Sequence, residues 1–280
     1  MKIGCFALVE PFTPLRRQFE IIAEMGVSYA DLSDTHDGAD LLAEFQHGAA
    51  TSLDVHPSLI EEALEGTGVE LTTVCAHSNL LDPPGPATYG TNQIIKAIKL
   101  AHFLGLPHVI TTEGEPRHRF GKSLTGEQQI FSIHERLIQP VAWAKRLGVQ
   151  LLLEPHGPVT CDMDATEELL RRLDEPEAVG LNLDTGNLWL GGSEPLEYIE
   201  RFGPQIKHVH WKDYGPEWIP RRGQIFGSGK STIALGDGEV GIAPVVRALK
   251  QIGFDGATTL EISGEQAIRT SVDRLREWSA

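Results

Sequence analysis

Short apolar, β-branched runs alternate with helical patterns along nearly the whole chain, and this alternation limits the fold more than any other feature. Most of the runs are apolar on both faces, as is typical of parallel strands covered by helices. The expected strands are Ile3–Leu8, Tyr29–Ser33, Leu71–His77, His108–Thr112, Val149–Pro155, Val179–Asp184, Ile206–Trp211 and Thr258–Ile262. The expected helices are Leu15–Met25, Pro57–Gly66, Thr91–Leu104, Thr125–Leu147, Ala165–Leu173, Pro195–Phe202, Ala243–Ile252 and Glu265–Trp278.

Eight strand–helix units in strict alternation are the number that closes a (β/α)₈ barrel. Several helical patterns end in a glycine followed at once by strand-like residues, as at Gly26, Gly105 and Gly148. The sequence therefore predicts an α/β protein, a single (β/α)₈ TIM barrel domain over residues 1–280 with its site at the C-terminal ends of the strands. A doubly wound open sheet is the rival fold. It normally has a glycine-rich turn after its first strand, whereas residues 10–14 read Glu-Pro-Phe-Thr-Pro.

The 280-residue chain has 24 Lys and Arg against 39 Asp and Glu, a formal net charge of −15. Binding to nucleic-acid phosphates needs a basic surface, so we expect no nucleic-acid partner. The first apolar run is too short for a signal peptide and no run approaches 18 apolar residues, so we expect no membrane partner. The three cysteines form no disulfide framework, and a cytoplasmic location is the expectation. The oligomeric state is left open, with a homo-oligomer as one option.

Two connections are longer than usual, residues 33–56 after the second expected strand and residues 213–241 after the seventh. Connections that follow the strands line the C-terminal face of a barrel, so both are expected near the site. Residues 227–232 resemble the end of a phosphate-binding P-loop, but Gln224 occupies the position of its first glycine and no strand precedes it. We interpret this segment as a flexible loop or lid.

Four acidic or imidazole side chains stand at the C-terminal ends of the last four expected strands: Glu154, Asp184, His210 and Glu261. One such carboxylate alone is more often a helix cap or a surface charge. In a barrel, however, these strand ends surround one opening, where carboxylates and an imidazole can bind a hard or borderline divalent cation. Three carboxylates without a cation would repel one another. The sequence thus predicts one divalent metal ion, Mn²⁺ first, with Mg²⁺, Co²⁺ and Zn²⁺ as alternatives.

These residues and their neighbours resemble the sugar phosphate isomerase/epimerase family of xylose-isomerase-like TIM barrels, which includes the ketose 3-epimerases. The matching segments are Glu154, Asp184–Asn187, His208–Asp213, Leu235–Val240 and Leu260–Glu261. The resemblance implies that the four residues above bind one metal ion. It also implies that the two glutamates among them are the catalytic acid and base, one on either side of the substrate.

The resemblance further implies a metal-dependent isomerase or epimerase of a ketose or related sugar or polyol. The metal would bind the carbonyl and a neighbouring hydroxyl, and one glutamate would remove the proton from the adjacent carbon. The other glutamate would return a proton to the opposite face of a metal-stabilised enediolate, while Asp184 and His210 hold the ion.

Further side chains are expected at the substrate: His156, Asn187, Arg222, Glu113 and His77. Asn187 occupies a position where many family members have a histidine that touches substrate. Arg222 resembles a family arginine that reaches a substrate hydroxyl, with the neighbouring Arg221 as the alternative. Glu113 and His77 end two strands.

Two more residues end strands or face inwards. Asp31 matches a common acidic position of the family and is expected to contact polar groups of the substrate. His208 precedes His210 by two residues and shares its orientation, so we expect it to be a buried histidine below the metal.

Other functions remain open. A dehydratase or lyase acting on a keto-sugar or keto-inositol would share the metal and the proton abstraction. The presence of His156 and Asn187 is the reason to retain this alternative. An endonuclease for abasic DNA on the same barrel would need further histidine ligands, one of them near Asn187, and a basic groove, which the net charge disfavours. A non-catalytic sugar-binding barrel is disfavoured by the presence of both Glu154 and Glu261.

Overall fold

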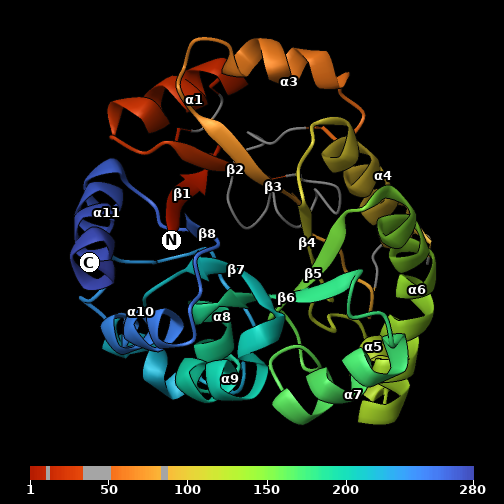
Figure 1. Ribbon diagram of the computed structural model, residues 1–280. Helices are drawn as coiled ribbons and strands as arrows, with labels where there is room; N and C mark the ends of the chain where they lie inside the picture. The colour runs from red at the N-terminus through yellow and green to blue at the C-terminus, as the bar shows by residue number, and fades with distance from the viewer. Residues whose placement is uncertain (11–12, 34–51, 83–87) are drawn as a thin grey trace.

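Eight parallel strands form a closed barrel in chain order, with the helices packed around it (Figure 1). The computed structural model describes residues 1–10, 13–33, 52–82 and 88–280. The strands are β1 (Lys2–Phe6), β2 (Tyr29–Ser33), β3 (Glu70–Ala76), β4 (His108–Thr112), β5 (Gln150–Glu154), β6 (Val179–Asp184), β7 (Ile206–Trp211) and β8 (Ala257–Leu260). Because β1 pairs with both β2 and β8, the barrel is closed. The prediction of a TIM barrel is confirmed and the open sheet is excluded.

Each expected helical segment is a helix whose ends differ from the expectation by a few residues at most. The helices are α1 (Leu15–Glu24), α3 (Pro57–Leu64), α4 (Tyr89–Phe103), α6 (Gly126–Leu147), α7 (Met163–Leu173), α9 (Pro195–Phe202), α10 (Ile242–Gln251) and α11 (Glu265–Ser279). Four short elements of the described residues were not predicted from the sequence: α5 (Arg119–Ser123), α8 (Thr185–Leu190), η1 (Gly203–Gln205) and η2 (Pro216–Arg221). Elements of one or two turns are too short to show an apolar periodicity.

Local signals account for the ends of α6, which is the longest helix in the described residues. Thr125 and Gln128 form a reciprocal capping box at its start, which satisfies backbone N–H groups that lack a partner within the helix. Gly148 ends the helix with φ 68°, a left-handed conformation that glycine adopts without steric cost. The glycine stop signals seen in the sequence are therefore real helix ends.

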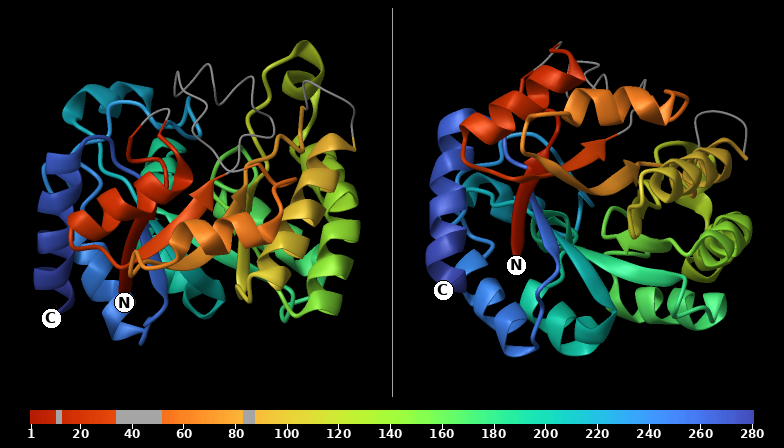
Figure 2. Two further views of the ribbon diagram at one scale, coloured as in Figure 1. Left: turned by 90° about the horizontal axis from the view of Figure 1, so that it is seen from above. Right: turned by 45° about the horizontal axis from the view of Figure 1, so that its top comes forward.

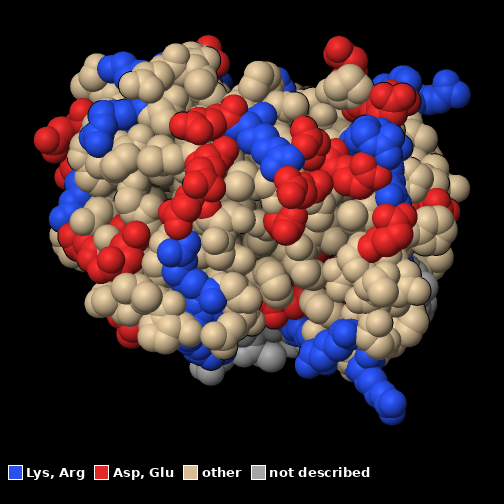
Figure 3. Space-filling view, turned by 90° about the horizontal axis from the view of Figure 1, so that it is seen from below, with Lys and Arg blue, Asp and Glu red and all other residues tan. Residues whose placement is uncertain are grey.

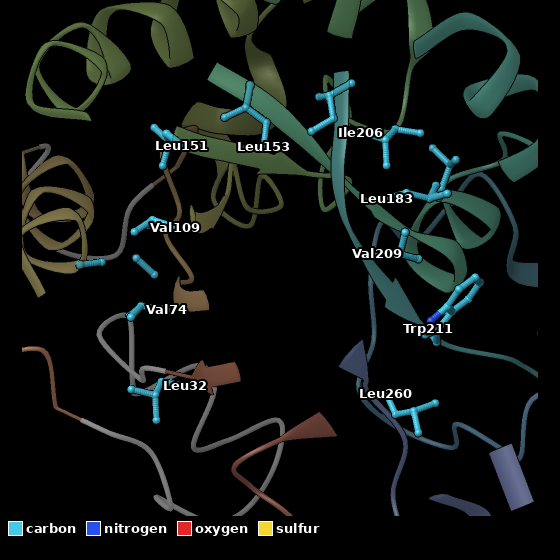
Figure 4. Close-up of a cluster of buried hydrophobic side chains, with 14 of the residues drawn as sticks. Leu32, Val74, Val109, Leu151, Leu153, Leu183, Ile206, Val209, Trp211 and Leu260 are labelled. Atoms are coloured by element: carbon cyan, nitrogen blue, oxygen red, sulfur yellow. The ribbon is translucent and has the colours of Figure 1, made fainter. Parts of the chain in front are cut away.

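The strands carry two separate sets of buried side chains. Apolar residues on the outer face pack against the helices, and Figure 4 shows labelled examples such as Leu32, Leu183 and Val209. A smaller cluster consists of Phe6, Cys75, Ile110 and Leu152, which fill the inside of the barrel. Since side chains alternate along a strand, a polar residue two positions beyond a member of this inner cluster also faces the barrel axis. Polar residues across the barrel from the cluster face the axis as well.

The side view on the left of Figure 2 shows both chain termini at one end of the barrel. Because β1 begins there and all strands are parallel, their C-terminal ends meet at the opposite end. Residues 213–241 follow β7 at that end and include η2. Of the other long connection, residues 34–51 lie outside the described residues.

The surface in Figure 3 shows Lys and Arg side chains scattered among Asp and Glu, with no continuous basic area on the face drawn. The absence of a nucleic-acid partner stays a prediction. Among the described residues, no helix combines the length and the apolar character needed to cross a membrane.

Candidate metal centre and active site

The ends of β5, β6, β7 and β8 bring together the four predicted metal ligands. Glu154 and Asp184 are the last residues of their strands, His210 is the last but one, and Glu261 directly follows β8. One potential ligand atom from each of the four residues lies within 4.8 Å of the others. Three of the side chains are fully buried, whereas Glu261 is 14% exposed, so the cluster opens to the outside at Glu261.

The chemistry of this cluster fits a divalent cation. Asp184 Oδ2, His210 Nδ1 and Glu261 Oε2 are buried and make no hydrogen bond within the described part of the chain. They meet only charged groups of the cluster: His210 Nδ1 lies 3.0 Å from Glu154 Oε2, and the two carboxylate oxygens lie 3.0 and 2.7 Å from the ammonium of Lys212. Three carboxylates this close together repel one another unless positive charge compensates them. Three carboxylates and one imidazole are a donor set suited to Mn²⁺, Zn²⁺ or a similar ion.

Lys212, which no sequence motif marked as a site residue, also reaches this cluster. Its Nζ lies 3.0 Å from Asp184 Oδ2 and 2.7 Å from Glu261 Oε2, and the side chain is only 2% exposed. The ammonium also donates to Asn187 Oδ1 at 3.1 Å. Lys212 thus supplies a positive charge among the carboxylates. Its position two residues after His210, on the same side of the chain, was the signal that could have identified it.

The surroundings move the pKa values of the two glutamates in opposite directions. Burial favours the neutral form of Glu154, but the charges of His210 and Lys212 outweigh it and hold the pKa of Glu154 well below its ordinary value. Burial raises the pKa of Glu261 to about 7, with Asp184 raising it further and Lys212 opposing the rise. In the protein alone, one glutamate is therefore ionised at neutral pH while the other titrates there, a pattern typical of acid–base pairs.

Two asparagine side chains hold the Glu154 carboxylate. Asn187 Nδ2 donates to Oε1 and Asn182 Nδ2 donates to Oε2, each at 3.1 Å. Asn187 is placed by α8, which begins directly after β6 because Asp184 Oδ1 caps it by accepting the Asn187 backbone N–H at 2.8 Å. Asn187 is thus part of the cluster, and its contact with substrate stays a prediction.

His77 and His156 lie at the border of the site. The ring centroid of His77 is 6.4 Å from that of Phe6, whose own ring lies 5.0 Å from His210 in an edge-on contact. His156 packs against Gly227, where an added Cβ would lie 2.7 Å from the imidazole ring. The segment that resembles a P-loop therefore lies over the end of β5 and lacks helical structure. Substrate contacts of both histidines, and a lid role for this segment, stay predictions.

The guanidinium of Arg222 has protein partners in the described residues. It donates to the Trp189 backbone carbonyl at 3.0 Å and to Glu194 at 2.6 Å, and it lies 4.6 Å from the Trp189 ring centroid. Arg221, the alternative, lies over the Trp218 ring at 5.2 Å. These contacts hold η2 against α8, and a substrate contact of Arg222 stays a prediction.

Glu113 supports the loop that follows β5. The side chain is 2% exposed, and its two carboxylate oxygens accept the backbone N–H groups of Val159 and Thr160 at 2.8 and 2.7 Å. Any side chain at Gly157 would collide with this carboxylate, so the close approach requires glycine there. Burial raises the pKa of Glu113 to about 7, although both backbone donors oppose the rise. A substrate contact of Glu113 stays a prediction.

Glu113→Gln will lower the free energy of unfolding by about 1–3 kcal/mol at pH 5, because one backbone N–H then faces an amide N–H. The deficit will shrink as the pH rises to 8. Glu113 has a folded pKa of about 7 against an ordinary 4.5, so its contribution to stability is complete below pH 4.5 and is lost as the pH rises through 7. The wild type therefore loses at most about 3 kcal/mol of unfolding free energy over this pH range, and the variant shows no such loss. Denaturant unfolding at pH 5, 6, 7 and 8 measures it, and a constant deficit contradicts it.

Comparisons with known proteins agree with this architecture. The family model described as xylose isomerase-like TIM barrel matches residues 19–278. The chain therefore belongs to the xylose isomerase-like TIM barrel family, as the sequence motifs had indicated.

One curated relative, the inosose dehydratase of Lacticaseibacillus casei, is 28% identical over 131 residues, which are 44% of this chain and 44% of the relative. The alignment thus spans less than half of the length of this relative. Two solved structures share the fold over nearly the whole chain. A D-tagatose 3-epimerase-like protein has a TM-score of 0.77 at 20% identity, covering 99% of this chain and 97% of its own. The IOLI protein with a binding zinc atom has a TM-score of 0.75 at 17% identity, and the match covers 100% of this chain and 98% of that protein.

Proposed function

We propose that this protein is a divalent-metal-dependent enzyme that removes a proton from the carbon beside the carbonyl of a keto-sugar or keto-inositol. The convergence of Glu154, Asp184, His210 and Glu261 carries this proposal. The zinc atom in the similarly folded IOLI protein supports a divalent ion at this site. Mn²⁺ remains the first ion to test, with Mg²⁺, Co²⁺ and Zn²⁺ as alternatives.

A bound divalent ion supplies Lewis-acid chemistry that polarises the substrate carbonyl and makes the neighbouring C–H group more acidic. Glu154 is the base. Its carboxylate is ionised and is oriented by one asparagine amide on each oxygen. Asp184 and His210 serve as ligands. Lys212 compensates the charge of Asp184 and Glu261.

Dehydration is the outcome we favour for the deprotonated substrate, because the curated relative matched by sequence is named an inosose dehydratase. In this reaction the C–H proton passes to Glu154, the electron pair forms a carbon–carbon double bond, and the C–O bond to the neighbouring hydroxyl breaks. Glu261, the other glutamate of the cluster, delivers a proton to the departing hydroxyl and water is released.

Epimerisation is the second candidate, and the placement of two glutamates in one cluster favours it. Here Glu261 returns a proton to the opposite face of the same carbon, and no C–O bond breaks. Incubation with inosose and with D-tagatose in D₂O separates the two reactions. Loss of one water molecule from the substrate supports dehydration. Incorporation of one deuterium without loss of water supports epimerisation. If no ketose or inosose tested undergoes either change, the proposed function is contradicted.

His210→Ala will remove the metal. Wild-type protein loaded with Mn²⁺ will hold about one ion per chain by elemental analysis, and the variant will hold a small fraction of that amount because it loses the single neutral ligand. The control is His134→Ala, since His134 is on the outer helix α6. About three ions per chain would favour the nuclease alternative, and none in the wild type would leave a non-catalytic sugar-binding barrel as the better account.

A further inference from the structure

Asp31 lies inside the barrel, on the side of His210 that faces away from Glu154. Its carboxylate is completely buried, and its Oδ2 atom lies 3.3 Å from His210 Nε2 and 3.4 Å from His208 Nε2. The Thr72 hydroxyl donates to Oδ1. A contact of Asp31 with substrate is expected from the sequence, and in the structure both of its oxygens face protein groups below the cluster. The β2 strand places Asp31 opposite β7, where two inward histidines face it, and a substrate contact of Asp31 stays a prediction.

These contacts belong to a closed ring of five buried side chains. From Asp31 the ring passes through His210, whose Nδ1 lies 3.0 Å from Glu154 Oε2. Glu154 accepts from Asn182 Nδ2 at 3.1 Å, and Asn182 Oδ1 lies 3.1 Å from His208 Nδ1. His208 then faces Asp31 again. Each member has its place fixed by two others, and His208 is the buried histidine that the sequence predicted.

Both nitrogens of His210 face a carboxylate, but only Nδ1 faces the group of predicted metal ligands. Nδ1 points into the cluster of predicted ligands, 3.0 Å from Glu154 and 3.7 Å from Glu261. Nε2 points to Asp31, a carboxylate that can only accept a hydrogen bond when ionised. A hydrogen bond on one imidazole nitrogen determines which nitrogen is free to bind a metal.

Cys75 lies close to Asp31 and His210, and one atom from each of the three lies within 4.8 Å of the others. A second cation on this side would need the thiolate form of Cys75, because the thiolate is the metal ligand. Cys75 is completely buried, and Asp31 Oδ2 already faces the Nε2 atoms of both histidines at 3.3 and 3.4 Å. The side of His210 that faces Asp31 is therefore suited to a hydrogen bond.

We infer that Asp31 is a positioning residue that accepts the Nε2–H of His210 and so presents Nδ1 as the metal-binding nitrogen. This inference rests on the metal site of the proposed function. It assigns Asp31 a role through His210 and no contact with substrate. The ring through His208 and Asn182 connects Asp31 with Glu154. The same ring therefore orients two of the predicted metal ligands, His210 and Glu154.

Nuclear magnetic resonance of ¹⁵N-histidine-labelled protein tests the hydrogen bond directly. In wild-type protein, with and without Zn²⁺, His210 Nε2 will carry a proton with a downfield signal that exchanges slowly with water. On addition of Zn²⁺ the large ¹⁵N shift will occur at Nδ1. Comparison with spectra of His208→Gln and His210→Gln assigns the signals. An unprotonated Nε2, or a zinc-induced shift at Nε2, overturns the inference.

Asp31 variants test the consequence for affinity. Asp31→Leu, which has a similar shape but no acceptor, will weaken Mn²⁺ binding by about 10–100-fold in calorimetry, the range found when such supporting partners are removed. Asp31→Asn keeps an acceptor oxygen and will lose less. Thr72→Val is the matched control, because it removes the partner of Oδ1 while Oδ2 still faces His210, and it will change the affinity less than threefold. Wild-type affinity in a folded Asp31→Leu protein overturns the inference.

The two experiments also separate this inference from the proposed function. If the wild type binds no metal, the proposed function fails, yet the Nε2 proton in the metal-free protein still decides whether Asp31 holds His210. If Asp31→Leu does not fold, Asp31→Asn and the wild-type spectrum decide the question. If the metal binds with the Nε2 proton absent, the proposed function stands and the role of Asp31 is rejected.

Discussion

Glu154→Gln will lower the rate of hydrogen exchange at the substrate carbon in D₂O by about 10²–10⁴-fold, the range expected for loss of a general base. A glutamine keeps one oxygen for an asparagine donor and for a metal ion, but its amide nitrogen cannot take up a proton. Mn²⁺ binding will therefore weaken only in part, because Asp184, His210 and Glu261 still converge. Mass spectrometry of the recovered substrate measures the exchange, and calorimetry measures the metal affinity.

The matched control is Glu168→Gln on α7, where the glutamate pairs with Arg171 and Arg172 on the outer surface. It will exchange substrate protons at the wild-type rate. Unchanged exchange in Glu154→Gln with full metal occupancy would remove Glu154 from the role of base and leave Glu261 as the candidate.

Lys212→Met will lower the free energy of unfolding of the metal-free protein by about 3–5 kcal/mol, the range for removing one partner of a buried ion pair. The ammonium lies 3.0 Å from Asp184 and 2.7 Å from Glu261, and the Lys212 side chain is only 2% exposed. Because a bound cation compensates the same carboxylates, Mn²⁺ will raise the melting temperature of the variant more than that of the wild type. Thermal unfolding with and without Mn²⁺ measures both effects.

Lys145→Met is the control for the lost charge, since Lys145 is 60% exposed and pairs with Glu175 on the surface. It will cost less than about 1 kcal/mol, and Mn²⁺ will stabilise it as it does the wild type. A metal-free Lys212→Met protein as stable as the wild type would show that the cluster tolerates its carboxylates without this charge.

The fold was readable from the sequence because the information that specifies it is local and repeated. Apolar runs and helical patterns alternate eight times, several helices end at a glycine such as Gly148, and a parallel barrel has few other ways to bury these runs. The meeting of Glu154, Asp184, His210 and Glu261 followed from the same regularity, since each ends a strand and the strand ends form one ring.

The partners of these residues depend on contacts between distant strands, which no local pattern encodes. Asp31 and His210 are 179 residues apart, and only the closure of the barrel brings the β2 carboxylate to the β7 imidazole. The loop partners of Glu113 and the helix partner of Arg222 show the same limit, because they too lie far away in the sequence. The periodicity of the chain thus specifies which residues face the barrel axis. The width and register of the closed barrel decide which of them touch, and hence which nitrogen of His210 faces Asp31 and which faces Glu154.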